Sequence, residues 1–352
     1  MCILCSLGTL RRKNHSRRSL PRWLKTSDSS AVLLYKAKYL LLKLRHGSGR
    51  VVSHSQFQRS CLASDTFCRF GSLWIRPKLC KFDVSETMAR SRVLQASWYD
   101  YPQYYDIACQ AYTRWEADFI VAACRKYCSF GARRLLEPAC GTGRLITELA
   151  ARGYQVSGFD LSQPALSYLR RQLKRRALHA ETFVAEMSDF RLGQPVDAAY
   201  CTVSTFPHLL TEQAARCHLQ CIVRGLRRGG IYVLGLRLLP VDVDISHAER
   251  WTQRRGKTKV TVTQRVLCID RRRRIENVQV CLMARRGSNE LRLQHTFQLR
   301  TYTARQFRRL LDSVPSLELC GAYDSRYDIE QPLGLNDKAV YTLFVLKRGL
   351  LS

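Results

Sequence analysis

The chain has 352 residues, 46% of them hydrophobic, and a formal net charge of +30. A chain of this length and composition can bury a full core, which excludes a wholly disordered protein. No apolar run reaches the roughly eighteen residues that a membrane-spanning helix needs, so we expect no membrane partner and a cytoplasmic location.

Fifteen cysteines are scattered through mostly apolar contexts, and no segment resembles a secretory signal. Cys2 and Cys5 form an isolated Cys-x-x-Cys, without the second pair that a zinc site usually needs. We therefore interpret the cysteines as reduced thiols and predict no metal site.

Residues 1–87 differ in composition from the rest. They carry a charge of +13, have no acidic residue before Asp28, and lack regular hydrophobic periodicity. Three interpretations remain open: an organellar transit peptide, a basic nucleic-acid-binding arm, or an extension outside the working protein, which would then begin at Met88. We favour the last, a disordered or non-native extension followed by one domain over residues 88–352.

From Trp98 onward, strands alternate with helices, which is typical of a parallel sheet. Ser162 is a good N-cap candidate for one of these helices. The predicted elements are a helix Thr113–Cys128, a strand Arg133–Ala139, a helix Arg144–Arg152, a strand Gln155–Asp160, a helix Pro164–Arg176, a strand Glu181–Ala185, a strand Val196–Cys201, a helix Thr211–Leu226 and, after the break Gly229-Gly230, a strand Ile231–Leu236.

After Leu239 the pattern becomes β-branched and alternating, which predicts a small antiparallel insertion over about 240–300. Its predicted strands are Lys259–Ile269, Ile275–Met283 and Leu291–Leu299, and a helix Thr303–Leu311 with strands Leu317–Tyr323 and Ala339–Leu346 follows. The predicted fold is α/β: a Rossmann-like, seven-stranded, mostly parallel sheet with helices on both faces and this insertion after the fifth strand.

The segment Leu135–Gly143 carries the strongest chemical signal. Glu137 lies near the C-terminal end of the apolar strand Arg133–Ala139, and Gly141 and Gly143 allow a tight turn close to a ligand before the next helix begins. Asp160 follows at the tip of the next strand, where an acid can bind a ribose diol. A nicotinamide-dependent dehydrogenase would have a third glycine near Thr147, and it is absent.

This arrangement resembles class I S-adenosylmethionine-dependent methyltransferases. Glu137–Gly143 is similar to their motif I, Gly158–Ser162 to their post-I motif, Ala185–Phe190 to the segment beside the adenine, and Asp197–Phe206 to their motif IV, which faces the reacting methyl group. The aromatic stretch Trp98–Asp106 resembles a lid over the cofactor.

The resemblance implies S-adenosyl-L-methionine as cofactor and assigns residues to it. The expected cofactor contacts are Tyr99, Tyr105, Glu137, Ala139, Gly141, Gly143, Asp160, Leu161, Glu186, Met187 and Cys201. The insertion is expected to roof the substrate through Trp251, Arg300 and Tyr302. Arg300 has a plainer interpretation as the surface partner of an acid. Tyr99 and Tyr105 likewise have a plainer interpretation as core residues.

His208 is the best-placed titratable group, because it lies just past motif IV and could accept a proton from a hydroxyl or amine. It could equally pack against the sheet. The Asn/Asp-Pro-Pro-Tyr/Phe signature of base methylation and the Pro-Cys nucleophile of cytosine methylation are both missing.

The sequence therefore favours methyl transfer to an O or N atom of a small molecule. Two alternatives remain: an RNA methyltransferase, favoured by the basic charge and by Arg271–Arg274, and a non-catalytic S-adenosylmethionine-binding protein.

Overall fold

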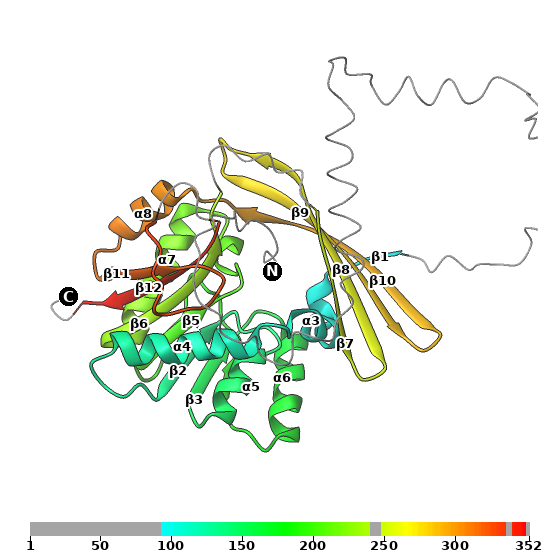
Figure 1. The fold of residues 1–352 in the computed structure, drawn as a ribbon, viewed down its shortest axis with the longest axis horizontal. Coiled ribbons are helices and arrows are strands. Elements are labelled where there is room, and N and C mark those ends of the chain that lie inside the picture. Colours follow the sequence, from blue (N-terminus) through cyan, green and yellow to red (C-terminus); the bar gives the residue numbers. More distant parts are fainter. Residues whose placement is uncertain (1–92, 240–247, 336–339, 350–352) are drawn as a thin grey trace, which may run out of the picture. The chain divides into compact units, whose positions relative to one another are not determined.

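The computed structural model describes residues 93–239, 248–335 and 340–349 (Figure 1). The predictions for residues 1–92 and 240–247, and for the start of the last strand at Ala339, lie outside these ranges. None of the helices within them combines the length and apolar composition needed to cross a membrane.

The larger sheet has seven strands in the order β11-β12-β6-β5-β2-β3-β4. The neighbours from β4 to β6 pair in parallel, whereas β12 pairs antiparallel with both β6 and β11. The strands are β2 (Arg134–Pro138), β3 (Gln155–Phe159), β4 (Glu181–Phe183), β5 (Val196–Cys201), β6 (Leu226–Arg237), β11 (Leu317–Tyr323) and β12 (Tyr341–Arg348).

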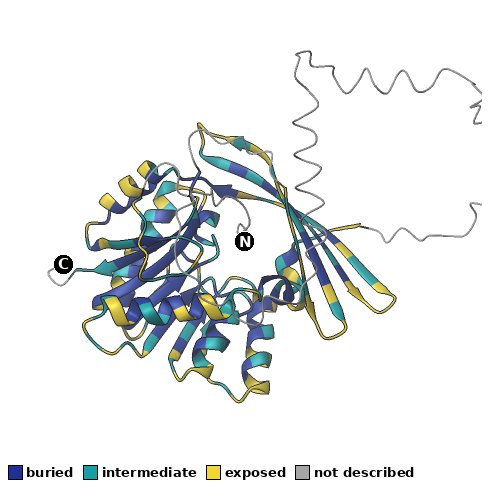
Figure 2. Cartoon of the chain, in the orientation of Figure 1, coloured by how far each residue is buried: buried dark blue, intermediate teal, exposed yellow. Residues whose placement is uncertain are grey.

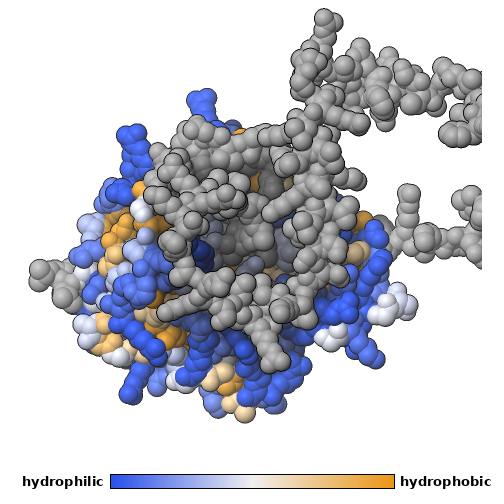
Figure 3. Space-filling model, in the orientation of Figure 1, coloured by the Kyte–Doolittle hydropathy of each residue, from blue (hydrophilic) through white to orange (hydrophobic). Residues whose placement is uncertain are grey.

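Both faces of this sheet are covered, because successive side chains of a strand point to opposite sides. Leu135 packs with the helices α4 (Thr113–Tyr127), α5 (Arg144–Ala151) and α6 (Gln163–Arg175), and Leu136 packs with α7 (Glu212–Gly225) and α8 (Ala304–Asp312). Figure 2 shows the strands of this sheet as mostly buried and the outer sides of the covering helices as exposed. On the face seen in Figure 3, the described side chains are mostly hydrophilic, with smaller hydrophobic patches between them. The predicted α/β class, a sheet flanked by helices, is confirmed.

Hydroxyl side chains cap three of the helices where the sequence suggests a start. Ser162 accepts a hydrogen bond from the backbone N–H of Ala165 at 3.2 Å, and Thr211 accepts one from Ala214 at 3.0 Å. Thr303 and Gln306 form a reciprocal capping box at the start of α8. These bonds satisfy backbone donors that no helical carbonyl can reach.

The smaller sheet has five strands in the order β1-β10-β9-β8-β7. β1 pairs parallel with β10 and the other neighbours are antiparallel. Its strands are β1 (Val93–Gln95), β7 (Ala248–Arg255), β8 (Thr258–Asp270), β9 (Ile275–Arg286) and β10 (Asn289–Arg300), and one face packs on η2 (Trp98–Asp100) and α3 (Pro102–Cys109).

The structure corrects one boundary and adds elements. β6 begins at Leu226, earlier than the predicted start at Ile231. The predicted irregularity at Gly229-Gly230 is nevertheless present, because the pairing of β6 with β5 shifts register between Leu226 and Ile231 and Gly229 has a φ of +74°. A Cβ on Gly230 would lie 2.7 Å from the carbonyl oxygen of Asp197, so this glycine permits a close approach of strands rather than a turn. β1, α3 and β7 are elements that the sequence pattern did not predict.

Candidate active site

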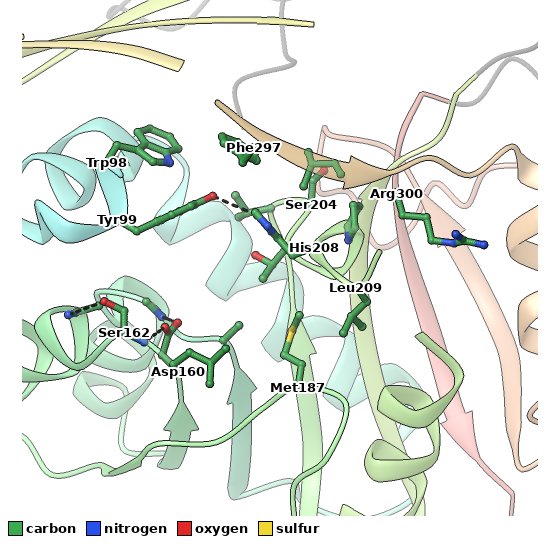
Figure 4. A pocket seen from close by; sticks show the side chains of 18 of the residues that line it. Trp98, Tyr99, Asp160, Ser162, Met187, Ser204, His208, Leu209, Phe297 and Arg300 are labelled. Carbon is green, nitrogen blue, oxygen red and sulfur yellow. Dashed lines mark hydrogen bonds between the residues drawn. The ribbon is translucent and has the colours of Figure 1, made fainter. Parts of the chain in front are cut away.

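A cavity of about 390 Å³ opens where the parallel strands end (Figure 4). Segments following four strands contribute to its wall: Ala139 after β2, Asp160 after β3, Ala185 after β4 and Val203 after β5. Residues of η2, α3 and the smaller sheet close the other side. Ligands of open α/β sheets bind at this edge.

Gly141 has the conformation and the open space that a ligand-binding turn requires. Its φ is +54°, and among the described residues an added Cβ would meet only the Tyr105 Cε1 atom, at 4.0 Å. A side chain here would therefore project into the cavity without touching the protein's own core.

Gly143 has a different role from the one expected. It lies outside the cavity wall, its N–H donates to the Cys140 carbonyl at 2.9 Å, and it is the N-cap of α5 at φ +68°. A Cβ would collide with Leu169 at 2.2 Å. Gly143 thus allows the turn to pack against α6 rather than leaving room for a ligand.

Asp160 links the glycine turn to the start of α6. Its carboxylate accepts the backbone N–H of Gly141 at 2.7 Å and that of Ser162 at 2.8 Å, one on each oxygen. Burial raises the pKa of this carboxyl, and the two backbone donors oppose that rise. Each oxygen keeps a second lone pair, so the acid can still accept bonds from a vicinal diol.

A buried polar network lies beneath the glycine turn. Arg144 forms an ion pair with Glu116 at 2.7 Å, and Thr202 donates to the same carboxylate at 2.6 Å. Glu137 is buried but does not line the cavity, and within the described residues its Oε2 atom has no hydrogen-bond partner. Burial raises the pKa of Glu137 to about 8, with Arg144 opposing that rise.

Three aromatic residues of the stretch that was expected to form a lid lie together. The rings of Trp98 and Tyr105 meet edge to face at 4.9 Å between centroids, and Tyr99 lies 5.5 Å from each. All three line the cavity. The sequence identified Tyr99 and Tyr105 from their position, whereas Trp98 was missed as an individual contact.

His208 comes from η3 (Phe206–His208) and faces the lid. Its Nε2 atom lies 3.1 Å from the Tyr99 hydroxyl, and its ring stacks on Phe297 at 5.5 Å between centroids. Burial, with a smaller contribution from His295, lowers the pKa of His208 to about 4. The imidazole is therefore neutral at physiological pH, and burial also raises the pKa of Tyr99, which keeps its proton.

The turn after β5 is strained. Val203 and Ser204 have φ values of +71° and +54°, a region that a β-branched residue rarely adopts. The Tyr341 hydroxyl accepts from Val203 N at 3.2 Å, and the Gly235 carbonyl accepts from Ser204 N at 3.1 Å. Both strained residues line the cavity, as does Ala139 at +49°.

The smaller sheet contributes a charged pair that the sequence analysis missed. Glu276 is 4% exposed, lines the cavity and forms an ion pair with Arg237, at the end of β6. Gln264 and Phe297 also reach the wall. An available signal was the alternation of β9, where Glu276 is an acid on a face otherwise formed by Val278, Val280 and Leu282.

Most of the expected cofactor residues line this one cavity. They are Tyr99, Tyr105, Ala139, Gly141, Asp160, Leu161, Glu186 and Met187. Cys201 does not, because it is 2% exposed inside the core between the sheet and α7.

Of the three expected substrate residues, only Arg300 lines the cavity. Trp251 lies outside the cavity wall and donates its indole N–H to the Ala108 carbonyl at 3.0 Å. Tyr302 is fully buried against Phe206 and Phe307. Arg300 touches the cavity, but its guanidinium bonds to the Leu210 carbonyl and to Glu212, and Figure 4 shows it extending away from the group around His208.

The cavity fits S-adenosylmethionine in three respects. Open space at Gly141 admits a ligand against bare main chain, Asp160 offers lone pairs to a diol, and Leu161 and Met187 give an apolar wall suited to a flat base.

Solved structures share this architecture. An S-adenosylmethionine-dependent methyltransferase from Clostridium acetobutylicum ATCC 824 aligns with a TM-score of 0.59 at 17% identity, covering 72% of this chain and 99% of its own. Streptomyces venezuelae DesVI aligns with a TM-score of 0.58 at 19% identity, with the same coverage. The chain therefore shares its fold with these two solved structures, the first of which is an S-adenosylmethionine-dependent methyltransferase.

The sequence comparisons lead to the same class. Residues 135–230 match the family model of a methyltransferase domain. A dTDP-3-amino-3,6-dideoxy-alpha-D-glucopyranose N,N-dimethyltransferase from Streptomyces fradiae is 30% identical over 146 residues, 42% of this chain and 55% of the relative. The match spans about half the length of such curated relatives. Residues 135–230 are thus similar to a methyltransferase domain.

Proposed function

We propose that the protein is an S-adenosyl-L-methionine-dependent methyltransferase that methylates an N or O atom of a small molecule. One observation carries the proposal: a single cavity joins the glycine turn and Asp160 to a second, polar and aromatic region around His208. A cofactor and an acceptor can therefore meet inside one enclosure.

The first region would hold the cofactor. Asp160 would bind the ribose hydroxyls, Gly141 would leave room for the amino acid portion, and Leu161, Glu186 and Met187 would surround the adenine. When bound, S-adenosylmethionine supplies an electrophilic methyl group on a sulfonium centre. Residues of the chain then need to orient an acceptor lone pair toward that carbon.

The lid contributes by excluding water and restricting the acceptor. Trp98, Tyr99 and Phe297 form an aromatic wall beside His208, so a bound acceptor has few orientations available. Holding two reactants in line supplies about 7–11 kcal/mol of a typical barrier. Positioning can therefore provide most of the catalysis, without a strong base.

His208 would act as a weak proton acceptor and an orienting group. With its pKa near 4 it is neutral at physiological pH, so it can accept a hydrogen bond from an acceptor N–H or O–H. It would take a proton only as the attacking atom gains positive charge. In this role the imidazole would carry its proton on Nε2 and donate it to the Tyr99 hydroxyl, 3.1 Å away, which fixes the ring and leaves Nδ1 as the acceptor.

The acceptor side favours a polar molecule. Gln264, Ser204 and the Arg237–Glu276 pair present both donors and acceptors to the cavity. Relatives at about 30% identity are named as N,N-dimethyltransferases of dTDP-linked amino sugars. We propose an acceptor of related chemistry, a hydroxyl-rich small molecule carrying an amine or a reactive hydroxyl.

The test is methyl transfer from labelled S-adenosylmethionine into a cell extract separated by size. We expect label in the low-molecular-weight fraction, and a loss of at least tenfold with His208→Phe, which removes the polar ring nitrogens. The exposed His179→Phe variant serves as the control and should keep full transfer. Label confined to RNA would contradict the proposal, as would the absence of transfer to either fraction.

A further inference from the structure

A second cavity, of about 710 Å³, lies on the other side of the glycine turn. Its wall comes from the start of α4, the start of α5, the end of α6 and the end of β7. Of the residues lining the cavity described above, only Thr142 also lines this one. The two cavities are therefore neighbouring but separate sites.

Five arginines line this second cavity, and they are of two kinds. Arg144 and Arg255 already pair with the buried acids Glu116 and Asp106. The other three are exposed and form no ion pair with a carboxylate of the described residues: Arg114, Arg175 and Arg176. The cavity's other acid, Glu148, pairs with Arg152. Among the residues that the structure describes, three positive charges thus lack a counter-charge in one concave site.

An aromatic ring lies on the same wall. Trp115 is 58% exposed, which is high for a tryptophan, and its ring lies 5.4 Å from that of Tyr112. Exposed tryptophan beside arginine offers a flat apolar surface next to charge, and bases or other planar rings stack on such a surface.

We propose that this cavity binds a phosphorylated small molecule with a planar ring, of the nucleotide class. Arginine presents a planar fork of donors that matches phosphate oxygens, and three unpaired copies supply the charge. The volume lies within the range of small-molecule sites. A long nucleic acid would instead need an extended basic track rather than a pocket closed by three helices.

The geometry explains why the arginines stay available. Asp106 is 7% exposed and accepts hydrogen bonds from Thr142 at 3.2 Å and Tyr168 at 2.9 Å in addition to its pair with Arg255. Asp106 is therefore already bonded to these three partners, and it does not neutralise the three unpaired arginines.

The experiment titrates the full-length protein with ADP and measures the tryptophan fluorescence and, by calorimetry, the heat of binding. A saturating amount of S-adenosylhomocysteine is present throughout, so that ADP cannot report on the cavity at Asp160. The variant Arg114→Gln/Arg175→Gln/Arg176→Gln is compared with Arg305→Gln/Arg308→Gln/Arg309→Gln, which removes the same charge from three exposed positions of α8. Melting temperatures of both variants verify folding.

We expect ADP to bind the wild type and the α8 variant equally and the pocket variant at least tenfold more weakly. Trp115→Leu should reduce ADP affinity while leaving the weaker binding of inorganic phosphate unchanged. Equal losses in both triple variants would show attraction by net charge alone and would overturn the proposal. So would the absence of ADP binding, or a requirement of the three arginines for RNA but not for ADP.

Discussion

Asp160 lines the cavity, and its carboxylate also accepts hydrogen bonds from the backbone N–H groups of Gly141 and Ser162. Replacing it with asparagine preserves one acceptor oxygen but removes the charge. We expect Asp160→Asn to weaken S-adenosylmethionine binding by about 1.5–3 kcal/mol, the range for hydrogen bonds to charged groups.

Calorimetric titration measures this loss, and Asp118→Asn, an exposed acid on α4, provides the matched control. Unchanged affinity in the Asp160 variant would refute its assignment to the ribose.

Buried His218 predicts how stability depends on pH. Its ring is fully buried, bonded to the Met187 carbonyl and the Tyr232 hydroxyl, and burial lowers the pKa to about 4. In the unfolded chain the ordinary pKa is about 6.5. Between these values the unfolded state binds a proton that the folded state does not, so stability falls as the pH decreases from about 6.5 to 4, by about 3 kcal/mol for this group.

Urea denaturation across this pH interval tests the effect. His218→Phe removes the titrating group, so its stability should depend less steeply on pH even if its baseline is lower. The exposed His179→Asn variant should keep the wild-type slope. Identical slopes for the wild type and the His218 variant would contradict the prediction.

At the scale of elements, the turn between β5 and η3 holds backbone strain beside the acceptor region. Val203 at φ +71° carries a side chain that this conformation disfavours. We expect Val203→Gly to raise the free energy of unfolding or leave it unchanged, because released strain of about 1–3 kcal/mol offsets the greater entropy of the unfolded glycine.

Methyl transfer should nevertheless fall, because the turn that presents Ser204 and His208 becomes less fixed. Thermal denaturation and turnover measure the two effects. Val184→Gly, an exposed valine without a positive φ, should instead lose about 0.5–1 kcal/mol. A Val203 variant that is less stable than the Val184 variant would show that the strain carries little energy.

The alternating elements could be predicted because their signals are local. The apolar run before Gly141 and the cap at Ser162 specify a strand, a turn and a helix without knowledge of distant residues. β7 could not be predicted in this way. Its sequence, Ala248–Arg255, is mostly polar and charged, and the strand exists because it pairs along β8.

The substrate side was predicted less well for a similar reason. Whether Trp251 or Glu276 faces the cavity depends on which face of the smaller sheet meets the larger one, and that is a tertiary choice. Tyr302 stands beside cavity residues in sequence but points into the core. The cofactor side, in contrast, follows directly from strand ends, and eight of the expected contacts line the cavity.

At the scale of the whole molecule, the sequence predicts that residues 1–87 are dispensable. They lack a sustained apolar period, and their charge of +13 would repel the +17 of the remainder if the two packed together. A shortened chain beginning at Met88 should melt at the same temperature and bind the cofactor equally well. A melting temperature many degrees lower would contradict this prediction, whereas a selective loss of RNA affinity would favour a nucleic-acid-binding arm.

The central claim is that the cavity at the strand ends holds S-adenosylmethionine, and Gly141 tests it most directly. A side chain at Gly141 projects into the cavity, whereas one at Gly153, also at positive φ (+88°), has no described heavy atom within 4 Å and lies outside it. Gly141→Val and Gly153→Val therefore introduce comparable backbone strain at different places.

Calorimetric titration with S-adenosylhomocysteine, alongside circular dichroism of both variants, gives the measurement. The account predicts one binding site in the wild type and in Gly153→Val, and no detectable binding in a folded Gly141→Val protein. Wild-type affinity in the Gly141 variant, or no binding by the wild type, would contradict it.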